Sequence, residues 1–278
     1  MKFITDLSGI DRMETGDQAN KRYSSPAVEQ SGRILFCLAA NSSTQMSLTE
    51  ICRQVKVSES KAFGILEALQ KTELIKRGKD GRGYSLGAGL LTLSQKVLRD
   101  LTPLRLAEPI LEGLTRETDS TSVYGSISGK NIYITAVKEA EGAMSVVARV
   151  GRTLPLTYGA HGKAIVAFLP QKEQDRILTG SDLYFHIEPG RLDRKKLKRE
   201  LAQCLRKGFA CDFGETAKGV NVVTAPVYGP AGIPIGFVEI FVLDSPEAAR
   251  RFGPKVVHAA KTLSRELGAP NTRRPVGV

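Results

Sequence analysis

The segment from Ile235 to Val242 carries one charged residue, Glu239, in a run that is otherwise apolar or glycine. Side chains alternate across a β-strand, so Phe237, Glu239 and Phe241 are expected to share one face. A carboxylate on such a face is costly unless it is paired or hydrogen-bonded. Two interpretations stay open: Glu239 lines a ligand cavity, or it lies in water on an edge strand or in an ion pair with an arginine.

A second group of residues has the chemistry to bind phosphate. Eight Lys and Arg and four Asp and Glu lie between Arg53 and Arg82, and four of the cations fall between Lys76 and Arg82. The turn-forming run from Gly78 to Gly83 separates two short alternating segments, which predicts a basic β-hairpin. A solvated surface hairpin would look similar. The clustering nevertheless favours contact with phosphate, because each such contact releases a counterion.

Two predicted helices precede this hairpin. Ser47 and Glu50 form a capping-box pattern at the start of the first helix, and Ser58 can cap the second. The second helix has a buried stripe and an opposite face of small residues and one cation, which could enter a DNA groove. The stripe is Ala62, Ile65, Leu66 and Leu69, and the opposite face is Lys61, Gly64 and Ala68. With a further helix at 28–40, residues 24–88 have the outline of a winged helix-turn-helix domain.

An apolar stripe continues after the hairpin and predicts a helix over residues 89–103, which Pro103 ends. The stripe consists of Leu90, Leu93, Val97 and Leu101. It must be buried against the second half of the chain or against another copy, so we expect a linker helix here. The second domain is placed at 104–270. Tails are expected at 1–23 and 271–278, and the first tail, expected to be flexible, has no signal-peptide pattern.

The second half of the chain mixes helical and strand patterns without an internal repeat. Helices are predicted at 104–118, 160–168, 171–179, 192–207 and 247–267, and strands at 122–128, 131–137, 145–150, 210–213, 220–228 and 235–243. Ser128-Gly129-Lys130 is a hairpin turn between the first two strands. This order predicts an α+β domain with a mostly antiparallel sheet.

The composition is that of an ordinary globular protein, with 278 residues, 41% hydrophobic and 25% charged. The net charge of +11 favours a polyanionic partner. The four scattered cysteines, Cys37, Cys52, Cys204 and Cys211, predict reduced thiols in a cytoplasmic protein. The uncharged segment 219–238 contains three prolines, which argues against a membrane-spanning helix.

Several short motifs, in this order, resemble the IclR family of bacterial transcriptional regulators over residues 28–268. They are LTEI (48–51), VSESK (57–61), GYSLG (83–87), VGRTLPL (150–156), GKA (162–164), RKGFA (206–210), Gly219 and APV (225–227). The resemblance implies a winged helix-turn-helix joined by a helix to a GAF-like α+β effector-binding domain. It also implies homodimers or dimers of dimers that bind palindromic operators in double-stranded DNA and respond to a small metabolite.

The resemblance further implies which residues contact DNA. These are Ser58, Ser60, Lys61, Phe63 and Gly64 on the second helix, and Arg77, Lys79 and Arg82 in the hairpin. The family's recognition helix usually has Thr, His and Arg where this chain has Lys61, Phe63 and Gly64. We therefore expect Lys61 to replace the family's arginine as the DNA contact.

The resemblance places the effector pocket around Glu239. The implied lining residues are Val146, Ala160, His161, Asp212, Val222, Glu239 and Phe241. This chain departs from the family where Val222 replaces a cysteine, and where Glu239 and Phe241 replace two small hydroxyl residues. Two acids and a histidine near Phe241 predict an effector with a hydrogen-bond donor or cationic group and an apolar part. They disfavour the small carboxylates that are usual for the family.

Two other function classes stay open on the sequence. A hydrolase could use His161, Asp212 and Glu239 as acid and base, but the chain has no nucleophile elbow, P-loop or dinucleotide fingerprint. A protein that does not bind DNA could use the basic segment 191–207 to bind an acidic partner, although such a segment is more often a solvated face. The same acids and histidine are metal-ligand types, but their spacing does not support a metal site. We expect a regulator without catalytic residues, cofactor, metal or membrane contact.

Overall fold

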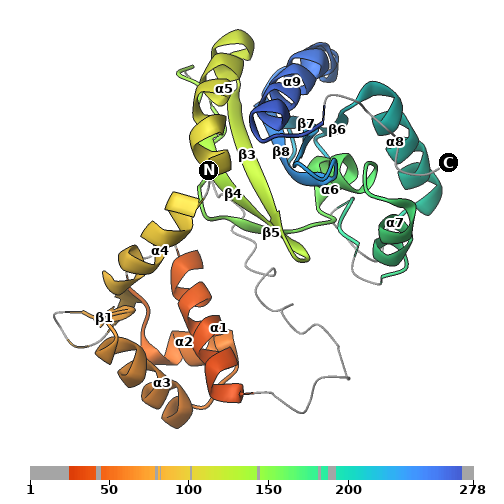
Figure 1. The fold of residues 1–278 in the computed structure, drawn as a ribbon. Helices are drawn as coiled ribbons and strands as arrows, with labels where there is room; N and C mark the ends of the chain where they lie inside the picture. Colours follow the sequence, from red (N-terminus) through yellow and green to blue (C-terminus); the bar gives the residue numbers. More distant parts are fainter. Residues whose placement is uncertain are drawn as a thin grey trace. The chain divides into compact units, whose positions relative to one another are not determined.

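The structure is a computed structural model, which describes residues 25–41, 45–78, 81, 83–100, 102–142, 145–180, 183–186 and 192–270. The chain forms two compact units that divide between Asp100 and Leu101. Figure 1 shows the fold of both. The tails predicted at 1–23 and 271–278 lie outside the described residues, as do Lys79 and Arg82.

The first unit is a winged helix-turn-helix. It consists of α1 (Pro26–Ala40), α2 (Leu48–Val55) and α3 (Glu59–Lys71), followed by the antiparallel hairpin β1 (Ile75–Arg77) and β2 (Tyr84–Leu86). One apolar core joins the helices and the hairpin, and Ile34, Ile51, Leu66 and Tyr84 are all buried in it. The helices and the wing predicted from the sequence are therefore confirmed.

The helix α4 (Gly89–Asp100) follows the wing, and α5 (Thr102–Thr118) begins the second unit. The helix predicted at 89–103 ends slightly earlier than expected. Pro103 lies in the first turn of α5, where its missing N–H is not needed. On α4, Leu91 and Leu93 are 68% and 57% exposed, so this helix presents apolar surface within the single chain. The side chains of Val97 and Leu101 lie outside the described residues.

The described part of the second unit is built around a six-stranded antiparallel sheet in the order β5-β4-β3-β8-β7-β6. The strands are β3 (Thr121–Ser128), β4 (Asn131–Lys138), β5 (Thr153–Pro155), β6 (Ala210–Phe213), β7 (Asn221–Tyr228) and β8 (Pro234–Val242). The helices α5 and α9 (Pro246–Glu266) cover one face, and α6 (Gly159–Val166) covers the other (Figure 1). Two further helices, α7 (Gln171–Leu178) and α8 (Arg194–Lys207), pack with α6 around a separate apolar cluster. The predicted α+β class is confirmed.

One predicted strand is wrong. Residues 145–149 have no regular structure, and the edge strand is β5, in which Thr153 pairs with Tyr133. A turn after residue 149 is bonded to β4, because Gly151 N–H donates to Ile134 O at 2.8 Å. Val146 is half-buried while Val147 is 58% exposed, so the segment alternates like a strand without pairing as one. None of the described helices is long and apolar enough to cross a membrane.

The capping box predicted for α2 is present. Ser47 Oγ accepts a hydrogen bond from the Glu50 N–H at 3.3 Å, and the Glu50 carboxylate accepts one from the Ser47 N–H at 2.8 Å. At the other end, Lys56 has a φ of 56°, which turns the chain towards α3. Ser58 precedes α3 as predicted, but its side chain makes no capping hydrogen bond.

The two serines allow a matched comparison of caps. Ser47→Ala should lower the free energy of unfolding by about 1 kcal/mol, whereas Ser58→Ala, which loses no side-chain cap, should cost less than about half of that. Hydrogen bonds from Ser47 lower the pKa of Glu50. The Glu50 carboxylate therefore contributes to the stability of the folded state above its unfolded-state pKa, and this contribution is lost as pH falls through its folded-state pKa. Urea unfolding of the two variants measures the difference, and equal losses would contradict the assignment of the cap.

Candidate effector pocket and DNA-contact surface

A pocket of about 160 Å³ lies between α6, the strands β7 and β8, and the segment 146–152. Six of the seven predicted effector residues line it, namely Val146, Ala160, His161, Val222, Glu239 and Phe241. Its wall also includes Arg149, Arg152, Tyr158 and Thr216, which sequence reasoning missed as pocket residues. A cavity of about 150 Å³ accommodates benzene, so this pocket suits a compact ligand of about one ring.

Glu239 is buried at the base of this pocket. β8 lies between β3 and β7, so Glu239 is on an interior strand, and its side chain is 4% exposed. Its Oε2 accepts a hydrogen bond from Thr224 Oγ1 at 2.5 Å, and Thr224 lies directly opposite on β7. The same oxygen lies 3.3 Å from His161 Nδ1. The interpretations that placed Glu239 in water or beside an arginine are therefore wrong, and the one that placed it in a cavity wall agrees with the structure.

His161 lines the pocket and has one ring nitrogen without a hydrogen-bond partner among the described residues. Its ring stacks with Tyr158 at a centroid distance of 5.7 Å and with Phe237 at 5.0 Å, which fixes its orientation. Nδ1 faces Glu239, while Nε2 is buried and has no hydrogen-bond partner among the described residues. A buried polar atom without a partner is costly. In the tautomer whose Nδ1–H donates to Glu239, the Nε2 atom is a hydrogen-bond acceptor.

Asp212 lies behind the pocket wall rather than on it. Its carboxylate accepts backbone hydrogen bonds from Glu215 at 2.7 Å and from Thr216 at 3.1 Å, and burial raises its pKa. Asp212 therefore fixes the loop that carries Thr216 to the pocket. Asp212 is not among the residues that line the pocket, so the structure does not support the predicted contact with the effector. The hydrolase hypothesis needed Asp212 beside His161 and Glu239, and the structure does not bring the three together.

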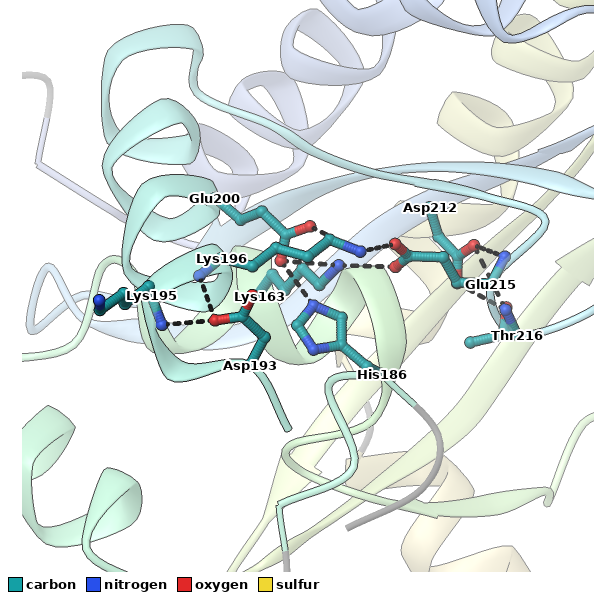
Figure 2. Close-up of polar contacts among 9 residues, drawn as sticks. All are labelled: Lys163, His186, Asp193, Lys195, Lys196, Glu200, Asp212, Glu215 and Thr216. Carbon is teal, nitrogen blue, oxygen red and sulfur yellow. Dashed lines mark hydrogen bonds and ion pairs between the residues drawn. The ribbon is translucent and has the colours of Figure 1, made fainter. Parts of the chain in front are cut away.

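A buried ionic network supports α6 below the pocket (Figure 2). Lys163 is 1% exposed, and its Nζ lies 3.0 Å from Glu215 Oε2 and 3.1 Å from Glu200 Oε2. Glu200 also lies 2.9 Å from His186 Nε2, and Lys196 pairs with Glu215. Since Lys163 follows His161 on α6 and Glu215 precedes Thr216, the network ties two walls of the pocket to α8.

The network also explains why the pKa of Glu215 is lowered although its side chain is partly buried. Burial by itself would raise the pKa of Glu215, but the ammonium groups of Lys196 and Lys163 outweigh this effect and the pKa is lowered. Ligand atoms of His186, Glu200 and Glu215 lie within 4.8 Å of one another, as in a metal site. The two lysines already neutralise both carboxylates, so the cluster is balanced without a metal ion.

Of the predicted DNA-contact residues, those that the structure describes are all exposed. Ala62, Ile65, Leu66 and Leu69 are buried as predicted, whereas Ser58, Ser60, Lys61, Phe63 and Gly64 are exposed. A Cβ built on Gly64 meets nothing within 4 Å, so another molecule can approach α3 closely there. In the wing, Arg77 Nε donates to Gly81 O at 2.7 Å and its guanidinium lies over the Tyr84 ring. Arg77 therefore also stiffens the hairpin.

Removing the buried lysine tests how strongly the network holds the pocket. Lys163→Met leaves Lys196, which is partly exposed, as the only ammonium beside Glu200 and Glu215 among the described residues, and should lower the free energy of unfolding of the second unit by about 3 kcal/mol. The loss should shrink as pH falls through the glutamate range, because a protonated Glu215 no longer needs a cation. The control is Lys138→Met, which breaks an exposed pair with Glu112 and should cost less than about 1 kcal/mol. Similar losses in both variants, measured by thermal unfolding at several pH values, would refute this role.

Known proteins share both the sequence pattern and this architecture. Residues 95–265 match the family "Bacterial transcriptional regulator IclR C-terminal". The chain is 30% identical over 252 residues to the HTH-type transcriptional regulator XynR of Escherichia coli, covering 88% of this chain and 98% of that protein.

Solved structures agree with this assignment. An IclR transcriptional regulator from Alicyclobacillus acidocaldarius superposes with a TM-score of 0.75 at 21% identity, covering 87% of this chain and 99% of that one. An IclR homologue from Microbacterium hydrocarbonoxydans, in complex with 4-hydroxybenzoate, superposes with a TM-score of 0.70 at 21% identity, covering 87% of this chain and 98% of that one. The chain therefore belongs to the IclR family of bacterial transcriptional regulators.

Proposed function

We propose that this chain binds its operator through the first unit and a small-molecule effector through the second, and that the effector modulates its activity as a transcriptional regulator. Residues 24–88 bind a palindromic operator, 89–103 link the domains, and 104–270 bind the effector. The chain acts as a homodimer or a dimer of dimers, since a two-fold operator pairs with a two-fold protein, and the apolar surface of α4 supports such an assembly. It works in the cytoplasm, where its DNA partner lies, and without catalysis, cofactor or metal.

The exposed face of α3 reads the operator and the wing contacts its backbone. Lys61 is an exposed cation one turn before Gly64 on α3, and Gly64 has no Cβ to hinder approach to a base edge. Arg77, together with Lys79 and Arg82, contacts phosphate. Contacts to bases set sequence preference, whereas contacts to phosphates add affinity for all sequences.

Exchanging these cations separates the two roles. Lys61→Ala should change the relative affinities across a library of operator variants, by about 1–3 kcal/mol at the base it contacts. Arg77→Ala should weaken binding to all members alike and reduce the dependence of affinity on salt. Fluorescence anisotropy with duplexes from the upstream region of the chain's own gene measures both. Unchanged relative affinities for the Lys61 variant would remove Lys61 from base recognition.

The proposed effector site rests on one observation: His161, whose Nδ1 faces the Glu239 carboxylate, has a buried Nε2 without a hydrogen-bond partner among the described residues. A ligand hydroxyl or amide can donate to this nitrogen, and the apolar wall covers the rest of a one-ring ligand. Arg149 and Arg152 are exposed pocket residues, so they add positive charge at the rim. They disfavour a cationic ligand and allow a carboxylate at that end. The 4-hydroxybenzoate in the Microbacterium homologue has this size and this pair of groups.

Glu239 should determine the preference for a ligand with a donor. Wild type should bind 4-hydroxybenzoate more tightly than benzoate, which lacks the hydroxyl group. Glu239→Gln removes the charge that holds the His161 Nδ1–H, so the hydroxylated ligand should lose its hydrogen bond to Nε2, a loss of about 0.5–1.5 kcal/mol. Glu239→Ser restores the family's small hydroxyl residue and should favour small carboxylates. Calorimetric titration measures these affinities, with Glu112→Gln on α5 as a control. If wild type, Gln and Ser variants all fail to discriminate the two ligands, Glu239 does not select the effector.

A further inference from the structure

The helix α8 carries most of the excess charge of the second unit. From Leu101 onwards the chain holds 25 Lys and Arg and 18 Asp and Glu, whereas the first 100 residues hold 15 and 11. α8 alone contributes seven Lys and Arg and a single acid, Glu200. This one helix therefore has a larger net positive charge than the whole helix-turn-helix unit, and it is the stronger candidate to contact a polyanionic partner.

The charges of α8 are sorted by face. Lys196 and Glu200 belong to the network of Figure 2, and Leu197, Leu201 and Cys204 are buried. The other six cations, Arg194, Lys195, Lys198, Arg199, Arg206 and Lys207, are all exposed. Among the residues that the structure describes, no salt bridge joins any of these six to a carboxylate. The outer face of α8, defined by these six cations, is thus uniformly positive.

This outer face works against the stability of its own helix. The first turn of α8 has no acidic residue and begins with Arg194 and Lys195 at the positive end of the helix dipole. Like charges also repel at i,i+4 spacing, as in Lys195 with Arg199. The N-cap Asp193 accepts hydrogen bonds from two N–H groups of the first turn and offsets only part of this repulsion. A surface that breaks local rules of stability without a gain inside the protein indicates a function.

We propose that the outer face of α8 is a second DNA-contact surface, which binds the phosphate backbone of the duplex that flanks the operator. Fourteen helical residues extend for about 21 Å, and duplex DNA carries one phosphate charge about every 1.7 Å along its axis. Several cations of the helix can therefore meet phosphates at once. The contact adds affinity and no sequence preference, because phosphates carry no sequence information.

DNA fits this surface better than an acidic protein does. The proposal rests on the operator binding proposed for the first unit. Once the operator is bound, flanking duplex is held near the same molecule, and a second contact gains from the resulting effective concentration. An acidic protein would have to be recruited from solution at full entropic cost.

The test uses the full chain and two duplexes, one trimmed to the operator footprint and one extended on both sides. The variant replaces Lys195, Lys198 and Arg206 with glutamine. It should bind the trimmed duplex as wild type does and the extended duplex more weakly. On the extended duplex, the slope of log affinity against log salt should fall by about 0.9 for each phosphate that the variant no longer neutralises. Relief of the repulsion should also raise the unfolding temperature at low salt, so weaker binding cannot be ascribed to misfolding.

A matched control removes the same number of charges elsewhere. It replaces Lys130, Lys172 and Lys261, which are also exposed residues of the second unit, and should leave both affinities and both slopes unchanged. An equal effect in this control, or an unchanged slope for the α8 variant on the extended duplex, would overturn the proposal; in the latter case an acidic protein would become the better partner. Failure of wild type to bind the trimmed duplex would instead contradict the proposed function of the first unit.

Discussion

A carboxylate buried on an interior strand must be compensated, and this requirement organises the effector pocket. Glu239 is compensated by Thr224 on the adjacent strand and by His161 on the helix that covers the sheet. The stacking of His161 between Tyr158 and Phe237 then decides where the second ring nitrogen points. The buried carboxylate and the stacking thus fix the orientation of a histidine whose second ring nitrogen has no hydrogen-bond partner among the described residues. Arg149 and Arg152, which are exposed, add positive charge at the rim of the same pocket.

The second unit relies on buried charges to hold its pocket walls as well as on its apolar core. Lys163 joins α6 to α8 and to the loop after β6, and the Asp212 carboxylate closes the same loop through backbone hydrogen bonds. The ion pairs therefore tie the helix that carries His161 to α8. The same network engages Lys196 and Glu200, and the other six cations of α8 have no ion-pair partner among the described residues.

The first unit is stabilised differently, by a small apolar core and by the cap of α2, and it keeps its polar residues on the surface. This division suits the function. In the proposed function, the DNA-contact face needs exposed cations and a close approach, which Gly64 allows, whereas a ligand pocket needs buried polar groups. The exposed apolar residues Leu91 and Leu93 of α4 are the observation that supports the proposed assembly of more than one chain.

The sequence by itself determined the elements of both units, because their signals are local. The capping box at Ser47, the buried stripe of α3 and the turn at Gly129 each need only neighbouring residues. The same local reasoning failed at residues 145–150, since an extended pocket wall alternates between buried and exposed positions as a strand does. The resemblance to a family placed Glu239 and His161 in the same pocket, but it did not predict the hydrogen-bond contact between them.

Only the tertiary structure decided which polar groups meet. The pairing of Thr224 with Glu239 depends on the register of β7 against β8, and the Lys163–Glu215 pair joins residues 52 positions apart. Asp212 was expected in the pocket, but the nearby backbone N–H groups satisfy its carboxylate instead. Such contacts leave no periodic trace in the sequence, because they are set by how distant elements pack rather than by the spacing of residues within one element.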